Sequence, residues 1–129
     1  MELKRFFSLQ EANQMLAEVR GLFERILPIS MRMQERQPQI AALAANNALN
    51  TGGAVGTAHV EDLLIVHNLL EELNGLGVVV KDFQRGLVDF PYDRNGEEVH
   101  LCWEYGEDAI RFWHEVDAGY AGRRPIEEL

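Results

Sequence analysis

The hydrophobic pattern of this chain changes its period once, around residues 75–78. Before that point, apolar residues recur every three or four positions, as they do along one face of an α-helix. After it, β-branched and aromatic residues form short runs and then alternate with polar ones, as in strands with one buried face. The sequence therefore predicts an α+β protein, with a helical arm over residues 1–76 and a β-rich end over residues 77–129.

The first helix is predicted to begin at a capping box and to extend, with interruptions, over residues 8–46. Ser8 and Glu11 have the spacing at which each side chain accepts a hydrogen bond from a backbone N–H of the first helical turn. Pro28 is expected to end or kink the helix, because proline lacks a backbone N–H and clashes with the preceding turn. The arm is thus expected to be long but broken.

The second predicted helix, which ends near Gly75, is apolar on more than one side. Leu63, Val66 and Leu70 form a seam with a spacing of three and four, while Leu64 and Ile65 widen the apolar surface. A long helical hairpin covers only one side of such a helix. We therefore expect a homo-oligomer that forms through the helices.

The β-rich end is predicted to be a small antiparallel sheet of three or four strands. Asn95-Gly96 is a strong hairpin signal, because both residues accept the positive φ angles of a tight turn. Pro91 is expected to end its strand or to mark an edge.

Alternation over residues 97–104 places Val99, Leu101 and Trp103 on one face of the sheet, and His100 and Cys102 on the other. A two-residue loop at 106–107 would then set the register of the next strand. In that register Leu101 lies opposite Phe112, and His114 points to the face opposite His100 and Cys102. A short helix over residues 107–116 is the alternative interpretation of this last segment.

Size and charge limit the classes of function. A chain of 129 residues is long enough for one domain with its own core. The net charge is −9, and residues 57–129 hold 16 acidic and six basic side chains. Such a surface repels phosphate backbones, so we expect no nucleic-acid partner. No segment is apolar over enough residues to span a membrane, and the single cysteine cannot form an internal disulfide. A cytoplasmic protein is expected.

Candidate ligand-binding residues gather near the end of the chain. Arg123 and Arg124 are a basic pair within an acidic half, and guanidinium groups bind carboxylate and phosphate in a fork. The predicted site for a small anionic ligand consists of these two arginines with Asp89, His114 and Glu115. The alternative is that the arginines pair with acidic side chains of the same chain.

A metal site is the second hypothesis. His100 and Cys102 share one predicted strand face and can both bind a transition metal, and Asp89 and His114 are further donors of the right type. An i, i+2 pair on a strand is not a recognised zinc spacing, however, and the sequence has neither a CxxC nor an HExxH motif. The cofactor, if any, stays unknown.

Three segments resemble a bacterial family catalogued as domain of unknown function 2203: FSLQEAN, GLGVVVKDFQRGLVDFP and LCWEYGEDAIRFWHEVDAGYAGRRPI. The resemblance covers nearly the whole chain. It implies a small cytoplasmic protein with a helical hairpin and a β-rich end, and it supplies no activity. The residues that recur in the family correspond here to Asp89, Phe90, Pro91, Cys102, Trp103, Gly106, Glu107, Trp113, His114, Gly122 and Arg123.

The sequence contains no catalytic signature. The expected function is therefore a non-enzymatic module that self-associates through its helices or binds a small anion. The alternative is a hydrolase or lyase, metal-assisted or based on cysteine and histidine, with its site in the β-rich end.

Overall fold

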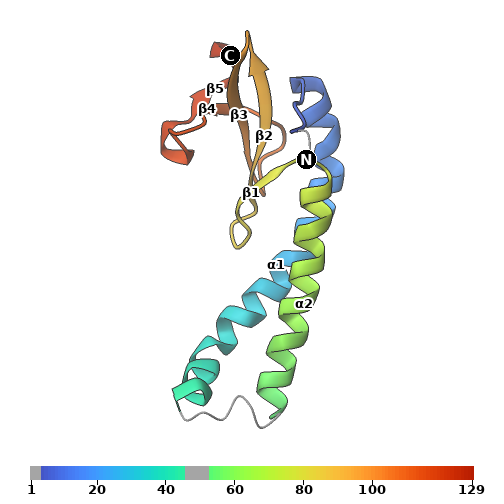
Figure 1. The fold of residues 1–129 in the computed structure, drawn as a ribbon, viewed down its shortest axis with the longest axis vertical. Coiled ribbons are helices and arrows are strands. Elements are labelled where there is room, and N and C mark those ends of the chain that lie inside the picture. Colours follow the sequence, from blue (N-terminus) through green and yellow to red (C-terminus); the bar gives the residue numbers. More distant parts are fainter. Residues whose placement is uncertain (1–3, 46–52) are drawn as a thin grey trace.

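The computed structural model describes residues 4–45 and 53–129, and its architecture is α+β (Figure 1). A helical hairpin comes first and an antiparallel sheet follows, as the sequence predicts. The sheet has five strands in chain order, so the expected three or four was an underestimate. The fifth strand is a two-residue edge segment that pairs with β4. The elements are α1 (Leu9–Ala45), α2 (Ala54–Gly75), β1 (Val79–Asp82), β2 (Leu87–Arg94), β3 (Glu97–Glu104), β4 (Phe112–Glu115) and β5 (Arg124–Pro125).

Helix α1 begins at the predicted capping box. The Ser8 N–H donates to Glu11 Oε1 at 2.9 Å, and the Glu11 N–H donates to Ser8 Oγ at 3.0 Å. The expectation that α1 is interrupted was wrong, since the helix continues through both Pro28 and Pro38. A helix can pass a proline when it gives up one backbone hydrogen bond and bends. In Figure 1 the C-terminal half of α1 diverges from α2.

The core lies between the first half of α1, the end of α2 and one face of the sheet. On that face the Phe23 and Trp103 rings lie 6.5 Å apart, and Phe7 packs edge-on against Phe90 at 5.2 Å. The buried residues of the core are Phe7, Ala12, Leu16, Val19, Phe23, Ile26, Leu69, Leu73, Val78, Val88, Phe90, Val99, Leu101, Trp103, Ile110 and Trp113.

Strands β2 and β3 form the hairpin that the sequence predicts. Asn95 and Gly96 have φ angles of 54° and 91°, the left-handed values that this short turn requires. The expectation that Pro91 ends its strand was wrong, because β2 continues to Arg94. Pro91 lies beyond the residues of β2 that pair with β1, and its carbonyl accepts the Phe7 N–H at 2.8 Å. A proline there removes no hydrogen bond between β1 and β2.

The predicted register between β3 and β4 was wrong by one residue. Leu101 lies opposite Trp113 rather than Phe112, and His100 lies opposite His114. The connection spans residues 105–111 instead of two residues. Ile110 leaves the ladder and is buried in the core, where its N–H donates to Asn13 Oδ1 of α1 at 2.9 Å. The strand interpretation of the segment holds, and the helical alternative is wrong.

The outer half of the hairpin is held together by a buried carboxylate. Asp62 of α2 accepts a fork of two hydrogen bonds from Arg32 of α1, at 2.6 and 3.0 Å, and its Oδ2 lies 3.0 Å from Arg36 Nη2. The Arg32 hydrogen bonds lower the pKa of Asp62 to about 2, with Arg36 helping and burial opposing. Among the described residues, neither helix has a stretch long and apolar enough to cross a lipid bilayer.

Asp62→Asn is expected to destabilise the protein by about 1 kcal/mol at pH 7, a value reduced for solvent screening around Arg32, whose side chain is 53% exposed. Because the pKa of Asp62 is lowered on folding, its contribution is present above the ordinary value near 4 and is lost as the pH falls through about 2. Urea unfolding at pH 7, 4 and 2 should show the difference between variant and native protein shrinking.

The control is Asp108→Asn. Asp108 has a similarly lowered pKa because of its hydrogen bonds with Arg111, but both side chains are exposed and solvent screens the pair. No measurable change in stability is expected for this variant. An equal loss in both variants would contradict the structural role given to Asp62.

Candidate functional site

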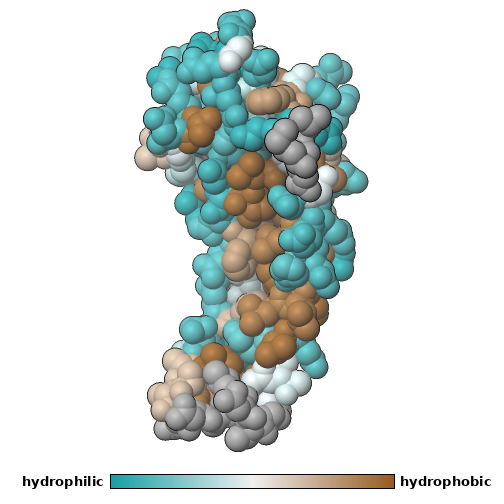
Figure 2. All heavy atoms as spheres, viewed as in Figure 1, coloured by the Kyte–Doolittle hydropathy of each residue, from teal (hydrophilic) through white to brown (hydrophobic). Residues whose placement is uncertain are grey.

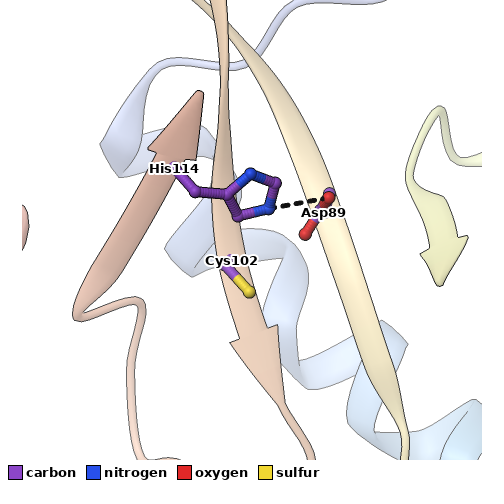
Figure 3. A group of neighbouring side chains, drawn as sticks. All are labelled: Asp89, Cys102 and His114. Atoms are coloured by element: carbon purple, nitrogen blue, oxygen red, sulfur yellow. Dashed lines mark ion pairs between the residues drawn. The ribbon is translucent and has the colours of Figure 1, made fainter. Parts of the chain in front are cut away.

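Three metal-capable side chains lie together on the face of the sheet that points away from the helices. Asp89 comes from β2, Cys102 from β3 and His114 from β4, and Figure 3 shows the imidazole reaching across β3 toward the carboxylate. At most 1% of the surface of each residue is exposed. One donor atom from each, an oxygen, a sulfur and a nitrogen, lies within 4.8 Å of the other two.

The register of the sheet explains why these side chains meet. Asp89 lies directly opposite Cys102, and His100 lies directly opposite His114. Residues that are paired across antiparallel strands point to the same face, and alternation sends Leu101 and Trp113 to the core face. Asp89, His100, Cys102 and His114 thus share the opposite face over three neighbouring strands.

The Asp89 carboxylate is the hub of the cluster. Its Oδ2 atom lies 3.0 Å from His114 Nε2 and 3.1 Å from His100 Nδ1, with Lys81 Nζ further away at 3.9 Å. Burial by itself would raise the pKa of Asp89, but the hydrogen bonds from the two histidines outweigh it and lower the pKa to about 2. Within the described residues, the buried Oδ1 atom of the same carboxylate has no hydrogen-bond partner.

The His114 ring is held at both nitrogens. Nδ1 donates to the backbone carbonyl of Glu115 at 2.7 Å, so Nε2 is the atom that faces the cluster. The hydrogen bond with Asp89 raises the pKa of His114 to about 10, with a further contribution from Cys102 and opposition from burial. His114 and Asp89 therefore form a buried ion pair at neutral pH.

A chain of contacts joins the cluster to the surface. His100 Nε2 lies 2.8 Å from Glu98 Oε2, and Lys4 Nζ donates to the same oxygen at 2.7 Å. The Lys4 hydrogen bond, with that of His100, lowers the pKa of Glu98. Because the Lys4 side chain is half exposed, the polar cluster meets solvent at this end of the sheet.

Arg123 covers the sulfur of the cluster. Its Nε donates to Cys102 Sγ at 3.3 Å, and its guanidinium forms a fork with Glu107 at 2.7 and 3.1 Å. It also lies over the rings of Phe112 and Tyr120, at 4.3 and 4.6 Å from their centroids. Burial by itself would lower the pKa of Arg123, but the hydrogen bonds to Glu107 and Cys102 outweigh it and raise the pKa.

The geometry does not match a cysteine–histidine–aspartate nucleophile. In such a triad, one ring nitrogen takes the proton of the nucleophile and the other is oriented by the carboxylate. Here Nδ1 of His114 is bonded to a backbone carbonyl, while Nε2 faces both Asp89 and Cys102. Burial of all three side chains also keeps a substrate away from the sulfur.

The structure brings together four of the residues predicted from sequence and separates two others. Asp89, His100, Cys102 and His114 form the cluster, so the expectation that His114 points to the other face was wrong. The cause is the one-residue error in register. The two that lie apart are Glu115 and Arg124. Both side chains are half exposed, and Arg124 Nη2 lies 3.4 Å from Glu115 Oε1.

Arg123 lies beside the cluster with its charge balanced by Glu107, as in the alternative that the sequence left open. The small-anion site remains a prediction.

Glu107 and Glu98 were missed as members of the site. Glu98 could have been found, because it precedes His100 by two residues and so shares its strand face. Glu107 lies in the long connection, where alternation carries no information.

Comparison with known proteins gives a family without an activity. The family model described as "Uncharacterized conserved protein (DUF2203)" matches residues 5–126. Neither the curated proteins nor the solved structures include a match. The match spans the helical hairpin, all four residues of the cluster and Arg123. The chain belongs to the DUF2203 family.

Proposed function

We propose that this protein is a non-enzymatic interaction module that self-associates through the outer half of its helical hairpin. The observation that carries the proposal is a set of large apolar side chains exposed on consecutive turns of α2. Val60, Leu63, Leu64 and Ile65, here called the apolar ridge, are 41–58% exposed. Monomeric proteins rarely expose large apolar patches, so several exposed apolar side chains on one short stretch of helix favour a partner surface.

The position of the apolar ridge indicates that it is available to bind another protein surface and is not needed for packing within the chain. The opposite side of α2 is already buried by Val66, Leu69 and Leu73, so the hairpin does not need the ridge for its own packing. Figure 1 shows this half of the hairpin extending beyond the sheet, and Figure 2 shows apolar surface continuing along it. A second hairpin packed there would complete a helix bundle.

The enzymatic alternative has less support. The groups that could perform acid–base or nucleophilic chemistry, Asp89, Cys102 and His114, are buried and bonded to one another or to the backbone. The same burial is expected in a protein that acts through its surfaces.

The double variant Leu63→Asp/Leu64→Asp is expected to convert the oligomer to a monomer. Burial of a leucine side chain contributes about 2 kcal/mol, and two buried carboxylates at an interface add a desolvation cost. Both side chains are about half exposed in the single chain, so the fold should survive. Leu70 is a poorer target because it packs against the core. Light scattering after gel filtration measures the mass.

Gln10→Glu is a suitable control, because it adds negative charge at an exposed position at the opposite end of the hairpin. It should leave the mass unchanged. Circular dichroism must show that the double variant keeps its helices. A monomeric mass for the native protein at micromolar concentration would rule out the proposal.

A further inference from the structure

We infer that Asp89, Cys102 and His114 form a binding site for a divalent transition metal ion of the Zn²⁺ class. The inference is independent of self-association, because the three side chains lie in the sheet and the ridge lies on the outer half of α2. It rests on how the donor atoms converge, on their chemical types, and on an unsatisfied carboxylate oxygen.

The donor atoms are almost close enough for one ion to contact them all. Zinc bonds of about 2.0 Å to oxygen or nitrogen and about 2.3 Å to sulfur place these donors roughly 3.3–3.6 Å apart in a tetrahedral site. The observed oxygen–nitrogen distance is 3.0 Å, and all three donor pairs are within 4.8 Å. Binding would require side-chain rotations of Cys102 and His114, because the observed oxygen–nitrogen distance is slightly shorter than a tetrahedral ion needs.

The chemistry of the donors selects the class of metal. A sulfur, an imidazole nitrogen and one carboxylate suit zinc and the neighbouring first-row ions, whereas Mg²⁺ and Ca²⁺ need several oxygen donors. The thiolate of Cys102 and the carboxylate of Asp89 together carry a charge of −2, which balances a divalent ion in a buried site. A cation bound there would be neutralised by its own ligands.

The unpaired Oδ1 atom of Asp89 points to a missing partner. Buried polar atoms are nearly always hydrogen-bonded, because a lone pair removed from water without a partner costs free energy. Oδ1 belongs to a residue with 0% of its surface exposed, and it has no partner within the described residues. A metal ion bound through Oδ1, together with the sulfur and the imidazole, would satisfy it, and Oδ2 would keep its contact with His100.

Each proposed ligand also has the outer contact that metal ligands commonly have. The Glu115 carbonyl fixes Nδ1–H of His114, so that Nε2 is presented to the ion, which would displace the proton that Nε2 shares with Asp89 in the metal-free protein. His100 contacts Asp89 Oδ2 at 3.1 Å, and the Arg123 Nε–H donates to Cys102 Sγ at 3.3 Å. An N–H directed at a sulfur stabilises a metal thiolate.

The ion would link β2, β3 and β4 through one side chain from each strand. Because the site is buried, its role is to stabilise the sheet and its Arg123 cover, and not to present a metal-bound water to a substrate. Three protein ligands leave one position of a tetrahedral ion for water or for His100, which lies beside Asp89.

The test is a metal titration of the chelator-treated protein. One equivalent of Co²⁺ should bind and produce a charge-transfer absorption from the Cys102 thiolate. Competing Zn²⁺ should displace the Co²⁺. At a free Zn²⁺ concentration about 100-fold above its Kd, the thermal unfolding midpoint should lie roughly 10 °C above that of the metal-free protein. Cys102→Ser should abolish the absorption and weaken affinity by more than the roughly 10–100-fold that an outer contact costs.

His67→Ala and Glu115→Gln are the controls. His67 is an exposed histidine on α2, and Glu115 is a half-exposed acid next to His114, so both variants should bind like the native protein. The proposal is overturned if the native protein takes up no stoichiometric metal, or if Co²⁺ binds without a thiolate band. Native affinity in a folded Cys102→Ser variant would also overturn it. Repeating the titration with Leu63→Asp/Leu64→Asp keeps this result separate from self-association.

Discussion

Asp89→Asn is expected to destabilise the metal-free protein by about 3–5 kcal/mol at neutral pH, the range found when one member of a buried ion pair is removed. The native carboxylate accepts hydrogen bonds from two buried histidines, His100 and His114, through a single oxygen. An asparagine has the same shape but no charge, so it would leave the imidazolium of His114 in the sheet without a counter-ion. Urea unfolding followed by circular dichroism measures the change.

The effect should depend on pH in a way that identifies the ion pair. The lowered pKa of Asp89 makes its contribution present above about 4 and lost as the pH falls through about 2. The raised pKa of His114 makes its contribution full below about 6.5 and lost as the pH rises through about 10. The difference between variant and native protein should therefore be largest at about pH 4–6.5.

Asp93→Asn provides the matched control. Asp93 is exposed on the same strand, and its Oδ1 accepts the Gly96 N–H at 2.7 Å, a hydrogen bond that an asparagine can also accept. Its effect should stay within about 0.5 kcal/mol. A difference between Asp89→Asn and the native protein that does not vary with pH would contradict the ion pair and indicate a packing effect alone.

The faces of the long strand β3 could be predicted from sequence because they depend only on alternation. Val99, Leu101 and Trp103 are apolar, and the structure buries all three in the core. His100 and Cys102 were predicted on the opposite face, where the structure places them with Asp89. Alternation of apolar and polar residues is a local property, so it can be recognised in a single sequence.

The face of His114 could not be predicted because it depends on a connection that side chains hold in place. Glu107 accepts the Glu104 N–H at its carboxylate and the Trp103 Nε1–H at its backbone carbonyl, which lengthens the turn beyond a tight hairpin. Asn13 of α1 then binds the Ile110 N–H. A shift of one residue moves every side chain of β4 to the other face of the sheet. The face of His114, and so its place in the cluster, therefore depends on this contact with a residue distant in sequence.

The partner of Arg123 was equally hidden from sequence. Its carboxylate, Glu107, lies 16 residues away in the connection between β3 and β4, and its sulfur contact, Cys102, lies 21 residues away in β3. Composition shows an excess of acidic residues but not which of them an arginine meets. In the structure the guanidinium of Arg123 packs on Phe112 and Tyr120 and lies beside Glu107.

Trp103→Ala is expected to destabilise the protein by about 3–5 kcal/mol through the cavity it leaves. The indole is fully buried and packs against Phe23 of α1, so its loss would weaken the attachment of the helix to the sheet. Its Nε1–H also donates to the backbone carbonyl of Glu107 at 3.0 Å. Glu107 lies in the connection between β3 and β4, and its carboxylate binds Arg123. Urea unfolding of each variant measures the loss.

Two further variants separate packing from the hydrogen bond. Trp103→Phe keeps a buried ring but removes the donor, so it should cost about 1–3 kcal/mol through the smaller ring and the unpaired Glu107 carbonyl. Tyr105→Leu, at a neighbouring side chain that is 37% exposed, should cost about 1 kcal/mol or less. If Trp103→Phe were as damaging as Trp103→Ala, the hydrogen bond that holds the connection would outweigh the contact with α1. The stability of the sheet would then depend on the loop next to the cluster more than on the helical face of the core.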